Sequence, residues 1–78
     1  MKKRKIDPIA VGIKNMIADR GFVQKAVALR AGYTSQQFND MLNGRKVIKA
    51  SDITPIANAL GVSVQDVYDA GLAQIATE

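Results

Sequence analysis

The sequence predicts a single all-α domain of five helices. Apolar residues recur at spacings of three and four along the chain, and no stretch shows sustained alternation of apolar and polar residues. Glycine and proline interrupt this periodicity, so each helix is short. The chain has 78 residues, of which 47% are hydrophobic, yet it contains only two tyrosines, two phenylalanines and no tryptophan. Such a composition builds one small core from closely packed aliphatic side chains and alanine.

The first helix begins at Asp7-Pro8, because aspartate caps a helix and proline fits its first position, where a missing N–H costs little. It runs to about Arg20 and ends at Gly21, a residue type that readily adopts the left-handed conformation found after helices. Its buried stripe consists of Ile9, Ile13, Met16 and Ile17.

The second helix spans about residues 23–31 and ends at Gly32. Its inner side carries Val27, Ala28 and Ala31, and its outer side carries Lys25 and Arg30. Thr34 then caps the third helix, with Gln37 at the spacing at which each side chain satisfies the other residue's backbone N–H. The third helix stops before Gly44.

The fourth helix opens at Ser51 or Thr54, since Pro55 is tolerated only in a first turn. Gly61 closes this helix, and Ser63 caps a short fifth one. The residues expected to point inward from the fourth helix are Ile53, Ile56, Ala57 and Leu60, and the fifth helix carries Val64 and Val67. From Gly71 onward the chain either extends the fifth helix or frays.

Several classes of function are excluded by composition. The chain has no cysteine and no histidine, which removes disulfides, thiol nucleophiles, imidazole bases and the usual zinc ligands. It shows no evident paired-carboxylate site, so we expect no metal, no cofactor and no enzymatic activity. No apolar run approaches the roughly 18 residues of a membrane span. The opening MKKRK is followed by Asp7-Pro8 and not by an apolar signal-peptide core; we therefore expect a cytoplasmic protein without a membrane partner.

Positive charge is concentrated in the first part of the chain. Residues 1–49 hold all eleven lysines and arginines but only three of the seven acidic residues, within a formal net charge of +4. This segregation favours a basic surface that faces a polyanion. Chance clustering on a solvated surface is the alternative.

The third helix has one polar and one apolar side. At about 100° per residue, an arc of about 140° carries only polar side chains. These are Ser35, Gln36, Asn39, Asp40 and Asn43. The opposite side carries Phe38, Met41 and Leu42, which suit the core.

The polar side has the composition of a surface that reads DNA bases. A merely solvated helix would more often carry lysine and glutamate, because serine, asparagine and aspartate are weak helix formers. Amides present a donor and an acceptor to adenine, aspartate accepts from cytosine, and serine pairs with several base edges. Basic residues outside this face could hold phosphates: Lys25, Arg45, Lys46 and Lys49. A polar surface helix without a ligand is the alternative.

Two segments carry a resemblance to a known family. Residues 24–44, QKAVALRAGYTSQQFNDMLNG, resemble the helix-turn-helix of the lambda-repressor and Cro-like (XRE) family. The shared positions are Gln24, Ala28, Gly32, Phe38 and Gly44. Residues 53–68, ITPIANALGVSVQDVY, are similar to that family's fourth and fifth helices, and the whole resemblance covers roughly residues 9–68. It implies a five-helix lambda-repressor-like DNA-binding domain.

The resemblance also implies roles for single residues. Gln24 matches a residue that commonly contacts a phosphate, and Asn43 matches one near a second phosphate. Ser35 and Gln36 match the opening base-reading positions, and Asn39 and Asp40 match further groove-facing positions. The N-terminal arm is similar to basic arms that wrap the duplex in some members, although an unstructured basic tag would look the same; its cations are Lys2, Lys3, Arg4 and Lys5.

Four positions depart from the family's pattern. Ser35 stands where many members carry glutamine, so that its base contact is expected to be shorter or water-mediated. Val23 lacks the hydroxyl that often caps the second helix. Leu29 and Leu42 replace residues that are often polar. Either leucine could contact a partner, although single exposed leucines are common.

These observations predict a sequence-specific binder of double-stranded DNA, of the phage or prophage repressor type, acting as a homodimer on a palindromic operator. The domains are then a basic arm (residues 1–7), the DNA-binding domain (8–70) and a tail or helix extension (71–78). Residues 64–76 either form the dimer contact or complete the monomer's core. The alternative is a protein-interaction or antitoxin-like adaptor that uses Leu29, Leu42 and the acidic C-terminal half. Its partner would be an antirepressor, a toxin or a polymerase subunit.

Overall fold

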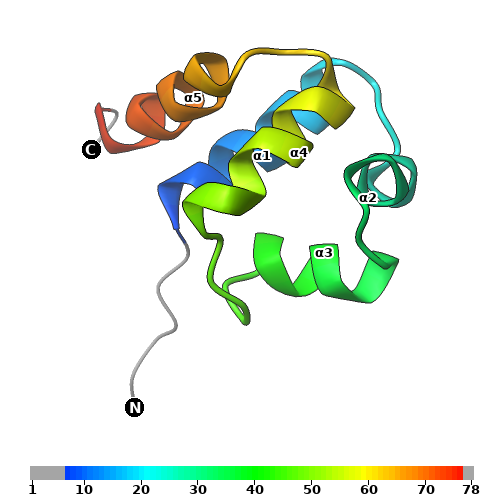
Figure 1. The fold of residues 1–78 in the computed structure, drawn as a ribbon. Helices are drawn as coiled ribbons and strands as arrows, with labels where there is room; N and C mark the ends of the chain where they lie inside the picture. Colours follow the sequence, from blue (N-terminus) through cyan, green and yellow to red (C-terminus); the bar gives the residue numbers. More distant parts are fainter. Residues whose placement is uncertain (1–6, 77–78) are drawn as a thin grey trace.

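The computed structural model describes residues 7–76, and this part of the chain folds into five helices without a strand. The helices are α1 (Pro8–Asp19), α2 (Gln24–Ala31), α3 (Ser35–Leu42), α4 (Ala50–Leu60) and α5 (Val64–Ala76). Figure 1 shows α5 at one end of the molecule and α2 and α3 at the other, with α1 and α4 between them. The predicted all-α fold of five helices is confirmed. None of these helices is long and apolar enough to cross a bilayer.

The core lies where the five helices meet, and α3 supplies much of it. The largest fully buried side chains are Ile13, Phe38, Met41, Leu42, Ile53, Ile56, Leu60 and Val67. Three of them come from α3. Burying three large side chains stabilises the fold by several kcal/mol, at about 1.5–3 kcal/mol each. The core therefore fixes the orientation of α3 and leaves its other side outward.

The most extensive contact between two helices joins α1 to α5. Two buried glycines allow the close approach. A Cβ atom on Gly12 would lie 2.9 Å from the carbonyl carbon of Ala70, and one on Gly71 would lie 2.8 Å from Cγ1 of Ile9. The inner side of α5, which includes the fully buried Val67, thus belongs to the core of the monomer.

The helix starts follow the predicted capping residues in three cases. Asp7 accepts a hydrogen bond from the N–H of Ile9 (2.9 Å) at the start of α1. At the start of α5, the Ser63 hydroxyl accepts from the N–H of Asp66 (3.0 Å), and the Asp66 carboxylate accepts from the N–H of Ser63 (3.1 Å). The third case is Thr34, described with the site below.

The predicted start of the fourth helix was wrong. The structure starts α4 at Ala50, after the cap residue Lys49, and places Pro55 within the helix beyond its first turn. The Asp52 carboxylate, and not the hydroxyl of Ser51 or Thr54, satisfies the helix start by accepting from the N–H of Lys49 (2.9 Å). A first-turn aspartate also interacts favourably with the helix dipole.

Asp52 has a second partner outside its own helix. The Tyr33 hydroxyl, from the turn between α2 and α3, donates to Oδ1 of Asp52 over 2.6 Å. The Tyr33 ring also stacks on Phe38, with ring centroids 6.3 Å apart. The Tyr33 hydrogen bond lowers the pKa of Asp52, with help from the Lys49 N–H. Burial and the same carboxylate raise the pKa of Tyr33 to about 12. This contact ties the turn between α2 and α3 to α4.

Candidate nucleic-acid interface

The turn between α2 and α3 determines where the polar side of α3 begins. Gly32 follows α2 with φ of 90°, a left-handed conformation that favours glycine. Two residues later, the Thr34 hydroxyl accepts from the N–H of Gln37 (3.0 Å), and the Gln37 side chain accepts from the N–H of Thr34 (2.9 Å). The predicted reciprocal cap is confirmed, and it fixes the first turn of α3, which carries Ser35 and Gln36.

The structure places the five polar residues of the predicted face outside the core. Ser35 and Gln36 are exposed, whereas Asn39, Asp40 and Asn43 are half-buried. Phe38, Met41 and Leu42 are at most 1% exposed. The helix is therefore divided between polar and apolar sides as the sequence indicates. The burial of Leu42 confirms its predicted place on the core side and removes the alternative in which it contacts a partner, because a fully buried side chain belongs to the core.

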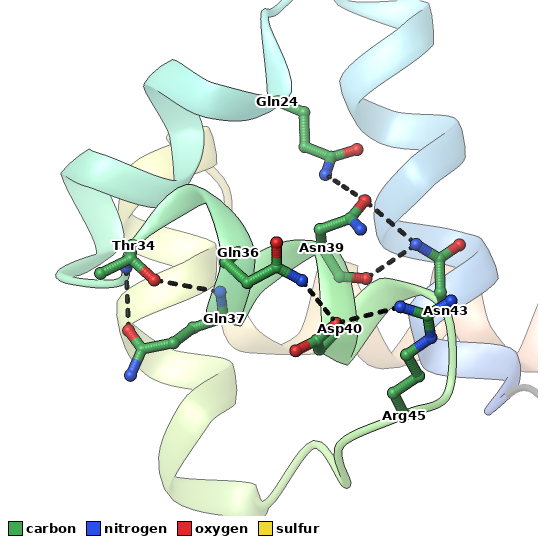
Figure 2. A network of polar contacts seen from close by, with 8 residues as sticks. All are labelled: Gln24, Thr34, Gln36, Gln37, Asn39, Asp40, Asn43 and Arg45. Atoms are coloured by element: carbon green, nitrogen blue, oxygen red, sulfur yellow. Dashed lines mark hydrogen bonds and ion pairs between the residues drawn. The ribbon is translucent and has the colours of Figure 1, made fainter.

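One chain of hydrogen bonds connects the start of α2 with the middle and end of α3 (Figure 2). Gln24 donates through Nε2 to Oδ1 of Asn39 over 3.3 Å. Asn43 donates through Nδ2 to the same Oδ1 (3.0 Å) and also to the backbone carbonyl of Asn39 (2.8 Å). The two helices of the helix-turn-helix are thereby joined by side chains on their outer surface.

A second group of contacts centres on Asp40 (Figure 2). Gln36 donates through Nε2 to Oδ1 of Asp40 over 3.0 Å. Arg45 Nη1 lies 3.8 Å from the same oxygen, in an ion pair between an exposed arginine and the half-buried aspartate. The backbone carbonyl of Asp40 also accepts from the N–H groups of Arg45 (2.9 Å) and Lys46 (3.2 Å). Asp40 thus contacts both the Gln36 side chain and the loop that follows α3.

The predicted phosphate-binding residues flank this surface on two sides. Lys25 lies at the start of α2, and with Gln24, Ser35, Gln36 and Asn39 it lines an open hollow of about 350 Å³. Arg45 and Lys46 lie in the loop after α3, and Lys49 caps α4; all three are exposed. The predicted arm residues, Lys2, Lys3, Arg4 and Lys5, lie outside the described residues.

The amide contacts among the predicted readers were not foreseen from the sequence. The spacing of four that separates Gln36 from Asp40, and Asn39 from Asn43, is the one at which helix side chains meet and could have indicated these pairs. The contact from Gln24 to Asn39 crosses 15 positions of sequence, and it depends on how α2 packs against α3. No local pattern carries that information.

A family model matches the sequence, and solved structures match the fold. The family model of the Cro/C1-type helix-turn-helix (HTH) DNA-binding domain matches residues 12–70. This match confirms the resemblance carried by residues 24–44 and 53–68. The matched family consists of DNA-binding domains and not of enzymes, as the composition led us to expect. No curated protein sequence matches the chain.

Three solved structures are similar to the chain in fold. Two are crystal structures of the clp gene regulator ClgR from Corynebacterium glutamicum, each with a TM-score of 0.83 and 21% identity. They cover 91% and 92% of this chain and 76% and 94% of their own. The third, the hypothetical transcription factor NHTF from Neisseria, has a TM-score of 0.70 and 20% identity, covering 86% of this chain and 78% of its own. At such identities the likeness shows the fold.

Proposed function

Because the chain belongs to the family of Cro/C1-type helix-turn-helix DNA-binding domains, we propose that it binds particular sequences in double-stranded DNA and represses transcription by occupying an operator, as phage and prophage repressors do. The observation that carries this proposal is the outer side of α3, where amides and a hydroxyl gather between flanking cations. The similar structures described as transcription regulators support a regulatory role.

In the proposed complex α3 lies in the major groove and α2 crosses the backbone. Ser35, Gln36, Asn39 and Asp40 then face base edges, and each good contact contributes about 1–3 kcal/mol of discrimination. Gln24, Lys25, Asn43, Arg45, Lys46 and Lys49 hold phosphates on the two sides of the groove, and the arm adds Lys2, Lys3, Arg4 and Lys5. Six contacted phosphates would give a slope of about −5 in log K against log salt.

A single module reads few base pairs, so we propose a homodimer on a palindrome whose half-site centres lie about ten base pairs apart. The outer side of α5 supports this assembly. Val64, Tyr68 and Leu72, at successive spacings of four, are 36%, 37% and 59% exposed. Tyr68 and Leu72 also line a mostly apolar hollow of about 240 Å³ together with Pro8 and Ile9 of α1. A second copy would cover this surface.

A second function, contact with a regulatory protein, is favoured by exposed apolar side chains before and on α2. Phe22 and Val23, which precede the helix, and Leu29, which lies on it, are 37%, 66% and 64% exposed. An adaptor of this kind would bind an antirepressor, a toxin or a polymerase subunit through such side chains. Such an adaptor would have no use for the amide-rich side of α3, and we therefore rank DNA binding first.

The experiment that tests the proposal compares Gln36→Ala with a matched control, Asn58→Ala. Both replace an exposed amide on a helix, but Asn58 lies in the last turn of α4. Titrations followed by fluorescence anisotropy use duplexes enriched by the wild-type chain from a random library. Gln36→Ala should bind them about tenfold or more weakly, with an unchanged melting temperature, and Asn58→Ala should bind like the wild type. Equal affinity of all three proteins would contradict the proposal.

A further inference from the structure

The amide of Asn39 is held in one orientation by its neighbours. Its Oδ1 accepts from Gln24 Nε2 at 3.3 Å and from Asn43 Nδ2 at 3.0 Å. Figure 2 shows these two donors reaching the same oxygen from opposite sides. An amide oxygen has two lone pairs, so both acceptor positions of Asn39 are occupied within the protein.

The orientation is fixed by a backbone group that can only accept. Asn43 Nδ2 donates to the carbonyl oxygen of Asn39 over 2.8 Å, and a carbonyl offers no hydrogen in return. The NH₂ group of Asn43, and not its side-chain oxygen, must therefore face both the backbone carbonyl and the side chain of Asn39. If the Asn39 amide were turned over, its NH₂ group would face the NH₂ group of Asn43, and neither could accept. Asn39 consequently keeps its oxygen inward and is left with Nδ2, which carries two hydrogens.

From this we infer that Asn39 reads DNA as a donor only and selects a guanine or thymine at the base pair it faces, because its own oxygen is already bound by Gln24 and Asn43. This inference rests on the proposed function. Guanine O6 and N7 and thymine O4 accept hydrogen bonds in the major groove and cytosine N4 donates one, whereas adenine presents an N7 acceptor beside an N6 donor. A donor-only asparagine leaves that N6 donor without a partner. An asparagine with both groups available pairs with adenine through donor and acceptor together. Asn39 can donate to adenine N7 but cannot accept from adenine N6, because its oxygen is already occupied.

The test replaces Asn39 by aspartate, which has nearly the same shape. In Asn39→Asp, one carboxylate oxygen still accepts from Gln24 and Asn43, so the contacts between α2 and α3 persist and the melting temperature stays close to that of the wild type. The outward group changes from a double donor to an acceptor. Selection from random duplexes, followed by sequencing, should show one position of the motif changing from guanine or thymine to cytosine or adenine. Duplexes that differ only at that position should change their preference by about tenfold or more.

Asn58→Asp is the matched control for charge, because it introduces the same negative charge at an exposed position of α4. It should keep the wild-type motif. A second variant, Asn43→Ala, removes one donor and lets the Asn39 amide turn over; adenine should then be accepted at the same position. This variant keeps the test informative if Asn39→Asp does not fold.

Three results overturn the inference. The first is an Asn39→Asp motif identical to that of the wild type with uniformly weaker binding, which would place Asn39 against a phosphate. The second is an Asn39→Asp protein that matches the wild type in both motif and affinity. The third, if only Asn43→Ala folds, is a motif that still excludes adenine. In each case the wild-type motif stands, and with it the proposed function. Failure of the wild-type chain to enrich any motif would instead overturn the proposed function itself.

Discussion

The Tyr33 hydroxyl donates a hydrogen bond of 2.6 Å to Oδ1 of Asp52 and so connects the turn of the helix-turn-helix to the first turn of α4. The same carboxylate accepts from the N–H of Lys49, one of the proposed phosphate-binding residues. The Asp52 side chain therefore contacts both the turn between α2 and α3 and a residue of the proposed DNA-binding surface.

Replacing Tyr33 by phenylalanine should destabilise the domain. The variant keeps the ring that stacks on Phe38 but removes the donor, and a hydrogen bond to a charged group contributes about 1.5–3 kcal/mol. Urea denaturation at neutral pH measures the free energy of unfolding. Tyr68→Phe is the matched control, because Tyr68 is 37% exposed, and it should change stability little. Equal stability of the two variants would show that the Tyr33 contact contributes nothing.

The Tyr33–Asp52 pair also predicts how stability depends on pH. The pKa of Asp52 is lowered in the folded state, chiefly by the Tyr33 hydrogen bond, so its contribution is present above the unfolded pKa of about 4. That contribution is lost as pH falls through the lower, folded value. The pKa of Tyr33 is raised to about 12 by burial and by Asp52, so its contribution is complete below the unfolded pKa of about 10 and is lost as pH rises toward 12.

Denaturation curves collected across the pH range check both directions. The stability difference between the wild type and Asp52→Asn should shrink below pH of about 4, and that between the wild type and Tyr33→Phe should shrink above pH of about 10. If both stability differences stayed constant across the pH range, the pKa shifts of Asp52 and Tyr33 would make no contribution to stability.

Asp40→Asn should separate affinity from specificity. The substitution removes a negative charge beside the proposed phosphate contacts, so binding to duplexes that lack the motif should become tighter. It also weakens the hold on Gln36, so discrimination at the base pair that Gln36 faces should fall by about fivefold or more. Competition titrations with single-position duplex variants measure this discrimination. Asp19→Asn is the control for charge, since Asp19 is exposed at the end of α1, and it should leave discrimination unchanged. If Asp40→Asn discriminated between duplexes as well as the wild type does, Asp40 would not position Gln36.

Leu72→Ser should disrupt the proposed dimer without unfolding the monomer. Leu72 is 59% exposed on the outer side of α5, whereas Leu29, the matched control, is 64% exposed on α2. Analytical ultracentrifugation of Leu72→Ser should show a lower dimer fraction than the wild type, and affinity for a palindrome should fall while affinity for one half-site persists. Leu29→Ser should assemble like the wild type. If Leu29→Ser alone impaired assembly, the contact would lie on α2.

Local signals were sufficient to predict most of the fold. Thr34 with Gln37, Ser63 at the start of α5 and the apolar side of α3 all follow from spacing within a few residues. The start of α4 could not be predicted from such local signals. The Asp52 carboxylate that accepts from the N–H of Lys49 there also accepts from the Tyr33 hydroxyl. This arrangement depends on residues far apart in sequence.

The composition of the proposed DNA-reading surface was predictable, but its internal hydrogen bonds were not. Periodicity places Gln36, Asn39 and Asp40 on one side, yet it does not show that Asn39 uses its oxygen within the protein. For Leu42, the polar residues that the family often carries at this position left a contact with a partner open, whereas its periodicity with Phe38 predicted the core. The structure agrees with the periodicity.

The most direct test of the central claim is a selection from random duplexes by the wild-type chain, with sequencing of the bound fraction. If the outer side of α3 reads bases, the enriched sequences should contain a short motif that Gln36→Ala alters, present in two inverted copies with centres about ten base pairs apart. Enrichment of no motif over the starting library, at low salt where phosphate contacts are strongest, would contradict the account.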